Sequence, residues 1–253
     1  DPSTGQLDWE TRLDWQDFPW MRLYPLEEPP PVNLRRLKAE VAYHDGNYLG
    51  NFAAELDGPA GTFSLHSPVS GDLQQIHLPA LELAAGQGKA EGKLGLRFAA
   101  GLAWEADLTF SALDPAYWFE ELPGRLAGTL RSHGSLRDQQ LDLAADLNLD
   151  GRLRGQPAAL HLQAQGAGNL WQVPRLEVHL GDNRIQGSGE LNRQLRGQLD
   201  LALPRLGQLW PGLRGQLGGR LDLAGSAAAP QGTLKLEGQR LGLEDLQLRR
   251  LDL

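Results

Sequence analysis

Short runs in which apolar and polar residues alternate, each closed by glycine, recur along most of this chain. The stretch from Gly215 to Gly238 is typical, because leucines stand at every second position on either side of an Ala-Ala-Ala-Pro-Gln-Gly run. Side chains two positions apart lie on the same face of a strand but far apart around a helix. The spacing therefore predicts strands, although leucine favours helices. The run of small residues with its proline predicts the turn between two strands.

The same alternation is present near the N-terminus and continues to the last residues. Leu7, Trp9, Thr11, Leu13 and Trp15 fall on one face of a predicted strand, with the aromatic side chains expected on its buried side. Counting all such runs predicts roughly sixteen to eighteen strands of about four to nine residues. We therefore expect an all-β meander.

One segment, Asp114 to Leu122, departs from the alternation. An aspartate suited to cap a helix, a proline at the first helical position and acidic residues predict a short helix there. Two stretches, from Ala90 and from Ile185, share an order of strands, a short bridge and a Pro-Gly pair. The pairs Pro123-Gly124 and Pro211-Gly212 lie about 88 residues apart. The chain is therefore expected to consist of degenerate β repeats.

The domain organisation predicted from these patterns is one continuous segment over residues 1–253. A proline-rich stretch at residues 25–31 is a candidate sub-boundary, and the repeat-like units cover about residues 90–180 and 185–253. No apolar run is long enough to span a bilayer as a helix, and the acidic first residues differ from a signal peptide. We expect a mature, soluble piece of a longer chain.

Composition argues against several functional classes. With 24 basic and 32 acidic residues the formal charge is −8 and the basic residues are scattered, so nucleic acid is not an expected partner. The chain has no cysteine, which removes disulfides, thiol catalysis and thiolate metal sites. The six histidines stand in unrelated segments without the spacing of metal ligands: His44, His66, His77, His133, His161 and His179. We expect no catalytic residues, no metal and no cofactor, and hence not an enzyme.

One face of the predicted sheet is rich in leucine and needs something apolar against it. The other half of the sheet, a second protein and lipid tails all fit that requirement, and acyl chains suit it because apolar burial is non-directional. Trp104, Trp118, Trp171 and Trp210 are candidates for the rim of a groove or for buried packing. The candidate inward residues are Leu141, Leu143, Leu147, Leu149, Leu160, Leu162, Leu176, Val178, Leu180, Leu199, Leu201, Leu203, Leu221, Leu223, Leu234 and Leu236.

The order of several motifs resembles one protein family. The motifs are ALDPAYWFEELPG (112–124), GDNRIQGSGEL (181–191) and LPRLGQLWPGLRGQLGGRLDLAGSAAAPQGTLKLEG (203–238). Together they resemble the periplasmic β-domain of the TamB family, the inner-membrane-anchored subunits of the translocation and assembly module. This family is akin to AsmA-like and bridge-like lipid-transfer proteins. The resemblance covers at least residues 90–253, whereas the first 85 residues match only in style.

The resemblance implies an elongated, curled sheet, an open trough with an apolar interior called a β-taco. It also implies a location in the periplasm of a diderm bacterium, as part of an inner-membrane-anchored protein whose anchor this segment lacks. The implied function is a conduit that carries phospholipids between the inner and outer membranes. The implied partners are phospholipid acyl chains and, through regions outside this segment, an outer-membrane protein of the Omp85 type similar to TamA.

Two other functions remain open at this point. A scaffold for outer-membrane β-barrel or autotransporter assembly would offer exposed strand edges to an incoming polypeptide. A structural β-repeat would have a filled core instead of a groove. Bound phospholipid separates the conduit from both alternatives.

Overall fold

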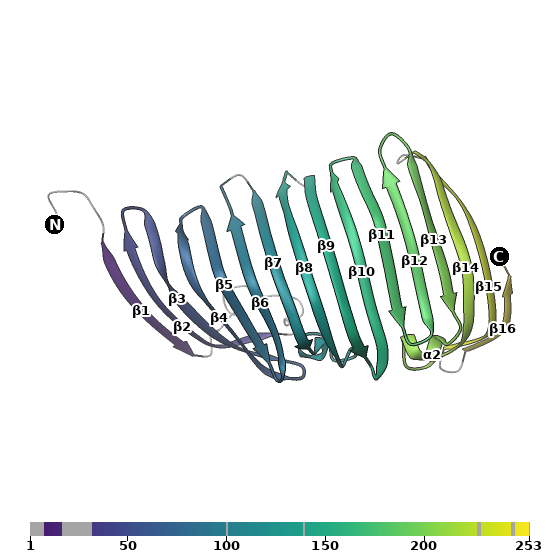
Figure 1. The fold of residues 1–253 in the computed structure, drawn as a ribbon, viewed down its shortest axis with the longest axis horizontal. Coiled ribbons are helices and arrows are strands. Elements are labelled where there is room, and N and C mark those ends of the chain that lie inside the picture. The colour runs from purple at the N-terminus through teal and green to yellow at the C-terminus, as the bar shows by residue number, and fades with distance from the viewer. Residues whose placement is uncertain are drawn as a thin grey trace. The chain divides into compact units, whose positions relative to one another are not determined.

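The computed structural model describes residues 8–16, 32–99, 101–138, 140–226, 229–243 and 246–252. The expected sub-boundary at residues 25–31 lies outside the described residues, as does Leu7. The chain divides into two compact units, Asp1–Ala127 and Gly128–Leu253. Each unit is an antiparallel meander in which strands that follow one another in the chain lie side by side (Figure 1). The predicted all-β fold, an open antiparallel sheet with very little helix, is confirmed.

The elements of the first unit are strands, one 3₁₀ helix and the start of a strand that continues into the second unit. They are β1 (Trp9–Gln16), β2 (Asn33–His44), β3 (Asn47–Gly58), β4 (Gly61–Asp72), β5 (Gln75–Ala85), β6 (Gly88–Arg97), β7 (Leu102–Leu113), η1 (Pro115–Tyr117) and the start of β8 (Gly124–Arg137). The second unit holds the rest of β8 and β9 (Gln140–Leu153), β10 (Gln156–Ala167), β11 (Leu170–Leu180), β12 (Asn183–Leu191), β13 (Leu195–Leu203), α2 (Leu206–Leu209), β14 (Leu213–Ser226), β15 (Ala229–Leu243) and β16 (Leu246–Asp252).

Tight turns join many of these strands. Asp45 and Gly46, between β2 and β3, have φ values of 52° and 87°, and Arg154 and Gly155, between β9 and β10, have φ values of 53° and 76°. Two consecutive residues of positive φ are the mark of the type I′ turn, whose twist matches that of the flanking strands. Glycine supplies the second position at no steric cost, whereas Arg154 holds a conformation that costs a non-glycine residue free energy.

Three of the prolines inside strands coincide with breaks in strand register. The register shifts beside Pro68 in β4, beside Pro79 in β5 and beside Pro174 in β11. Proline has no N–H to donate to a neighbouring strand, so a bulge at that position is its least costly place in a sheet. A bulge also inserts one residue into the alternation and changes which residues share a face.

The turn expected after Gly225 is shorter than the sequence suggests. Pairing continues to Ser226 opposite Ala229, and Pro230 lies within β15, opposite Gly225. The expectation that Pro230 and the two residues after it belong to the turn is therefore wrong. The described pairing of β15 with β16 spans residues 237–243 of β15. Among the described residues, Pro230 pairs with β14 alone, and a proline costs little where its missing N–H is not needed by a second neighbouring strand.

Strand β1 forms as predicted, but its apolar side chains are not buried. Trp9, Leu13 and Trp15 are 43%, 39% and 41% exposed. The strand pairs with β2, and the Trp9 ring stacks on Tyr43 with ring centroids 5.5 Å apart. The alternation predicts which side chains share a face but not whether a second layer covers that face. The expectation of buried aromatic side chains is therefore wrong.

The helix expected over Asp114–Leu122 is reduced to the three residues of η1. Asp114 does cap it, since its Oδ1 accepts the backbone N–H of Ala116 at 3.0 Å. The same oxygen accepts the N–H of Gly124, the first residue of β8, at 2.8 Å. One carboxylate thus fixes both ends of the bridge between β7 and β8.

The η1 bridge packs on two earlier turns of the first unit. A side chain at Gly58, beside the β3–β4 turn, would collide with the carbonyl oxygen of Tyr117, and one at Gly86, in the β5–β6 turn, would meet the Tyr117 hydroxyl at 2.8 Å. The Phe63 ring is buried against this bridge, with its centroid 5.2 Å from that of Trp118 and 6.2 Å from that of Tyr117. Aromatic packing therefore holds η1 in place.

Candidate functional site

The predicted inward residues of the second unit are brought together by strand register. Residues directly opposite each other in antiparallel strands share a face. One row across the sheet consists of Leu149, Leu160, Val178, Ile185, Leu201, Gly219 and Leu236. The next row consists of Leu147, Leu162, Leu176, Gly187, Leu199, Leu221 and Leu234. We call this surface the leucine face.

The remaining predicted residues lie at the borders of these rows. Leu143 is opposite Gly166 in β10, Leu223 is opposite Gly197 in β13, and Leu141 is half-buried in β9. Leu180 and Leu203 differ from the rest because they are buried near α2. They belong to the packed end of the strands and not to the open part of the leucine face.

Most side chains of the leucine face are half-buried, and Leu223 and Leu234 are 36% and 45% exposed. Among the described residues of the second unit, the buried hydrophobic residues are Leu180, Leu203 and Leu206, all near α2. A filled core between two layers would bury the leucines of the rows as deeply. The leucine face is therefore an apolar surface that its own unit leaves partly open.

The opposite face of the same strands is charged and internally paired. Arg220 lies opposite Asp200 in register, with their side chains 3.8 Å apart, and its Nε donates to Asp222 at 3.0 Å. The hydrogen bond to Asp222 raises the pKa of the Arg220 guanidinium. Arg175 lowers the pKa of Glu177 in the same way on β11. One side of the sheet is thus polar and the other apolar.

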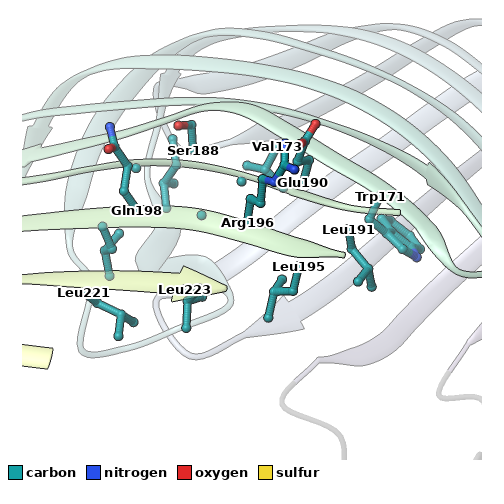
Figure 2. Close-up of a pocket in the computed structure, with 15 residues that line it drawn as sticks. Trp171, Val173, Ser188, Glu190, Leu191, Leu195, Arg196, Gln198, Leu221 and Leu223 are labelled. Carbon is teal, nitrogen blue, oxygen red and sulfur yellow. Dashed lines mark ion pairs between the residues drawn. The ribbon is translucent and has the colours of Figure 1, made fainter. Parts of the chain in front are cut away.

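An apolar pocket of about 340 Å³ lies on the leucine face. Figure 2 shows Leu191, Leu195, Leu221 and Leu223 on one side of the strands, with Ser188, Glu190 and Gln198 on the other. The pocket is lined by Trp171, Val173, Leu176, Gly187, Ser188, Gly189, Glu190, Leu191, Leu195, Arg196, Gly197, Gln198, Leu199, Leu221 and Leu223. Two of these residues, Gly189 and Gly197, are glycines that lie opposite each other on the leucine face, where an absent side chain leaves space.

Trp171, which the sequence suggested for the rim of a groove, lines the pocket together with Val173, although alternation along β11 does not place either residue on the leucine face. Both are odd-numbered, whereas Leu176 and Val178 further along β11 are even-numbered, so a regular strand would put the two pairs on opposite faces. Trp171 nevertheless lies opposite Leu191, and Val173 lies opposite Gly189. The register shift beside Pro174 changes the phase and places both sets on the leucine face. The proline inside an otherwise regular strand was the available signal.

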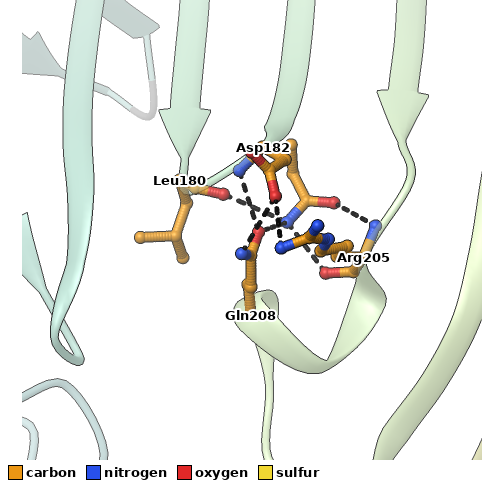
Figure 3. Close-up of polar contacts among 5 residues, drawn as sticks. Leu180, Asp182, Arg205 and Gln208 are labelled. Atoms are coloured by element: carbon orange, nitrogen blue, oxygen red, sulfur yellow. Dashed lines mark hydrogen bonds and ion pairs between the residues drawn. The ribbon is translucent and has the colours of Figure 1, made fainter.

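One end of the strands is closed by the α2 bridge, which rests on the β11–β12 turn (Figure 3). Asn183 is 1% exposed, and its Nδ2 donates to the carbonyl oxygens of Leu180 at 3.0 Å and Arg205 at 2.9 Å. Its Oδ1 accepts the N–H of Arg205 at 3.1 Å. Gln208 Oε1 accepts from Asn183 Nδ2 and from the Asp182 N–H. Asn183 is therefore a buried and fully satisfied link between turn and bridge.

The bridge also reaches an earlier turn, that between β9 and β10. Arg154 donates from Nη1 to the carbonyl oxygen of Leu209 at 2.8 Å, and its guanidinium lies 5.3 Å from the ring centroid of Trp210. A cation over an aromatic face is attracted by the ring quadrupole. The α2 bridge is thus fastened to two turns, just as η1 is fastened to two turns of the first unit.

Among the described residues, no group of three or more His, Cys, Asp or Glu side chains could hold a metal ion. None of the described helices has the length and apolar character needed to cross a membrane. His161, on β10, contacts Asn148 at 3.1 Å through Nδ1, and His66 lies 3.2 Å from Glu82. These histidines take part in pairwise contacts on the strands.

The comparisons with known proteins agree on one family. The family model described as TamB, N-terminal domain, matches residues 1–253. The chain is also similar to the translocation and assembly module subunit TamB of Haemophilus influenzae, with 29% identity over 214 residues. That similarity covers 80% of this chain and 16% of the relative, so the chain spans a small part of the relative's length. No solved structure matches this chain.

Proposed function

Because the chain belongs to the TamB family, we propose that it is a segment of a conduit that carries phospholipids across the periplasm between the inner and outer membranes, with acyl chains on the leucine face. The observation that carries the proposal is the pair of leucine rows, continuous over β9 to β15 and only half-buried. On this proposal the segment binds and conducts, and performs no chemistry.

The physics of apolar burial suits transport along such a face. Covering it is worth about 25 cal/mol per Å² and needs no fixed register between the occupant and the wall. An acyl chain that moves from one strand to the next exchanges one leucine environment for another, so no step along the rows requires a large free energy. The paired charges on the opposite face keep that side in water.

The name of the Haemophilus influenzae relative describes a translocation and assembly module subunit. We place this segment in a module of that kind in the cell envelope, with an outer-membrane partner of the Omp85 type bound by other parts of the full protein. The face described above is then the part of the module that meets lipid.

The proposal is tested by site-specific photo-crosslinking in cells, in the full-length protein. One probe replaces Leu201, which lies on the leucine face opposite Ile185 and Gly219. The control probe replaces the adjacent Asp200, on the polar face opposite Arg220. We expect a phospholipid adduct at position 201 and none at position 200. Capture of only its own chain at 201 would show a dry core, and capture of an unfolded outer-membrane β-barrel would favour the scaffold function.

A further inference from the structure

An apolar pocket of the second unit lies where two glycines face each other beside the second leucine row. Gly187 stands in the second row, where its neighbours on both sides are leucines, and Gly189 lies directly opposite Gly197 on the next strand. Gly197 in turn faces Leu223 of β14. Gly189 and Gly197, on two adjacent strands, leave a recess whose floor is backbone and whose walls are leucine, valine and tryptophan side chains, whereas the Leu199 side chain fills the space beside Gly187. The recess differs from the rest of the face in shape while its apolar character is the same.

The chemistry of the recess favours an uncharged occupant. The indole N–H of Trp171 already donates to the carbonyl oxygen of Gly168 at 2.8 Å, so the ring presents only its apolar surface. Glu190 and Arg196 belong to the opposite face and lie 3.6 Å from each other, so their charges are paired. A headgroup with a phosphate would find no partner on the apolar side and would lose its hydration there.

From these observations we propose that the recess is a discrete binding site for one hydrocarbon chain of a phospholipid, a fixed station on the leucine face. The inference rests on the proposed function, because it assumes that lipid reaches the leucine face. A volume of about 340 Å³ lies at the lower end of the range for small-molecule pockets, roughly 300–1,000 Å³. That size corresponds to part of a single hydrocarbon chain, so the rest of the phospholipid would lie outside the recess.

A side chain added at Gly189, on the floor of the recess, would occupy the proposed binding site. Gly189 does not have a positive φ, and a Cβ there would have the Arg196 carbonyl oxygen at 3.3 Å and the Gly197 Cα at 3.5 Å as its nearest neighbours. A valine suits an extended backbone and places its methyl groups in the recess. Gly218→Val is the matched control, because Gly218 lies on the polar face and a Cβ there has its nearest atom at 3.8 Å.

The readout is the yield of phospholipid adduct in the full-length protein in cells, with a photo-reactive probe in place of Leu195 or of Leu201. Leu195 lines the recess and Leu201 lies further along the face. We expect Gly189→Val to lower the adduct at position 195 by roughly tenfold, equivalent to about 1.4 kcal/mol of binding, and to leave the adduct at 201 unchanged. Gly218→Val should change neither adduct.

The possible failures are distinguishable. An unchanged adduct at 195 in Gly189→Val would overturn the station, as would an equal fall at both positions that Gly197→Val reproduces. Gly197→Val fills the same recess from the neighbouring strand and guards against a folding defect specific to Gly189. Absence of any lipid adduct at 201 in the parent protein would instead contradict the proposed function itself.

Discussion

The two bridges, η1 in the first unit and α2 in the second, stand at equivalent places in their meanders but are held by different chemistry. Each leaves the end of a strand and rests on the two hairpin turns that precede it at that end: β3–β4 and β5–β6 for η1, β9–β10 and β11–β12 for α2. The η1 bridge is packed by Phe63, Tyr117 and Trp118. The α2 bridge is held by hydrogen bonds of Asn183 and Gln208 and by Arg154.

The different chemistry of the two bridges indicates that the position of a bridge is constrained, whereas the type of side chain that holds it is not. The geometry recurs because a bridge at this point links three successive strand ends, whereas the side chains that make the link can be aromatic or polar. Sequence similarity between the repeats is weak for the same reason. The aromatic bridge is stabilised by burial of apolar surface, and the polar bridge by hydrogen bonds to every buried polar group. We therefore expect different substitutions to destabilise the two bridges.

The largest effect is expected from Phe63→Ala. Phe63 is 5% exposed, and truncating a buried phenylalanine leaves a cavity that costs about 3–5 kcal/mol. Loss of this packing should release η1, which is measured as faster hydrogen exchange of the Trp118 amide, bonded to the Pro115 carbonyl. Phe98→Ala is the control, because Phe98 is largely exposed. Equal effects of the two substitutions would contradict an aromatic bridge.

Asn183→Ala is expected to be the next most severe. It removes partners from the Arg205 N–H and from two carbonyl oxygens at a buried site, and a buried unsatisfied group costs about 1–3 kcal/mol. Faster exchange of the Arg205 and Asp182 amides measures the loss. Asn192→Ala, in the exposed turn at the other end of β12, should leave both amides protected. Protected amides in Asn183→Ala would show that α2 is held by apolar contacts instead.

A smaller effect is expected at Arg154, and the test is which of two variants, Arg154→Ala or Arg154→Gly, is the more stable. Arg154→Ala loses the contact with Trp210, about 0.5–1 kcal/mol, and the bond to the Leu209 carbonyl while keeping the strained φ of 53°. Arg154→Gly loses the same contacts but relieves the strain, so it should be the more stable of the two by about 1 kcal/mol. The free energies of unfolding of the two variants decide the order. Equal values would show that the β9–β10 turn carries no strain.

The alternation of the sequence was sufficient to predict the meander and the leucine face. It works because the side-chain period of a strand is fixed by covalent geometry and because strands joined by tight turns pair with their neighbours. Leu160, Leu201 and Leu221 therefore fall on one face without any knowledge of tertiary contacts. The occupancy of that face remains a prediction.

The features that sequence could not supply depend on contacts between distant residues. Arg154 bonds a carbonyl 55 positions away. Pro174 signals a bulge in β11, but which residues the bulge brings onto the leucine face depends on pairing with β12. Neither effect has a periodic signal. The exposed β1 aromatic residues and the shortened η1 belong to the same class, because burial and helix length are decided by what the rest of the unit places beside them.

The smallest effect expected is a difference in salt dependence between the two bridges. Arg205 and Asp182 form an ion pair of 3.0 Å between largely exposed side chains beside α2. Such pairs contribute about 0–1 kcal/mol and are weakened at about 1 M salt, where the screening length is only about 3 Å. High salt should therefore speed exchange of the Asp182 amide slightly and leave that of Trp118 in the aromatic bridge unchanged. In Arg205→Gln the response at Asp182 should disappear. A response that persists in this variant, or one of equal size at Trp118, would mean that charge does not distinguish the bridges.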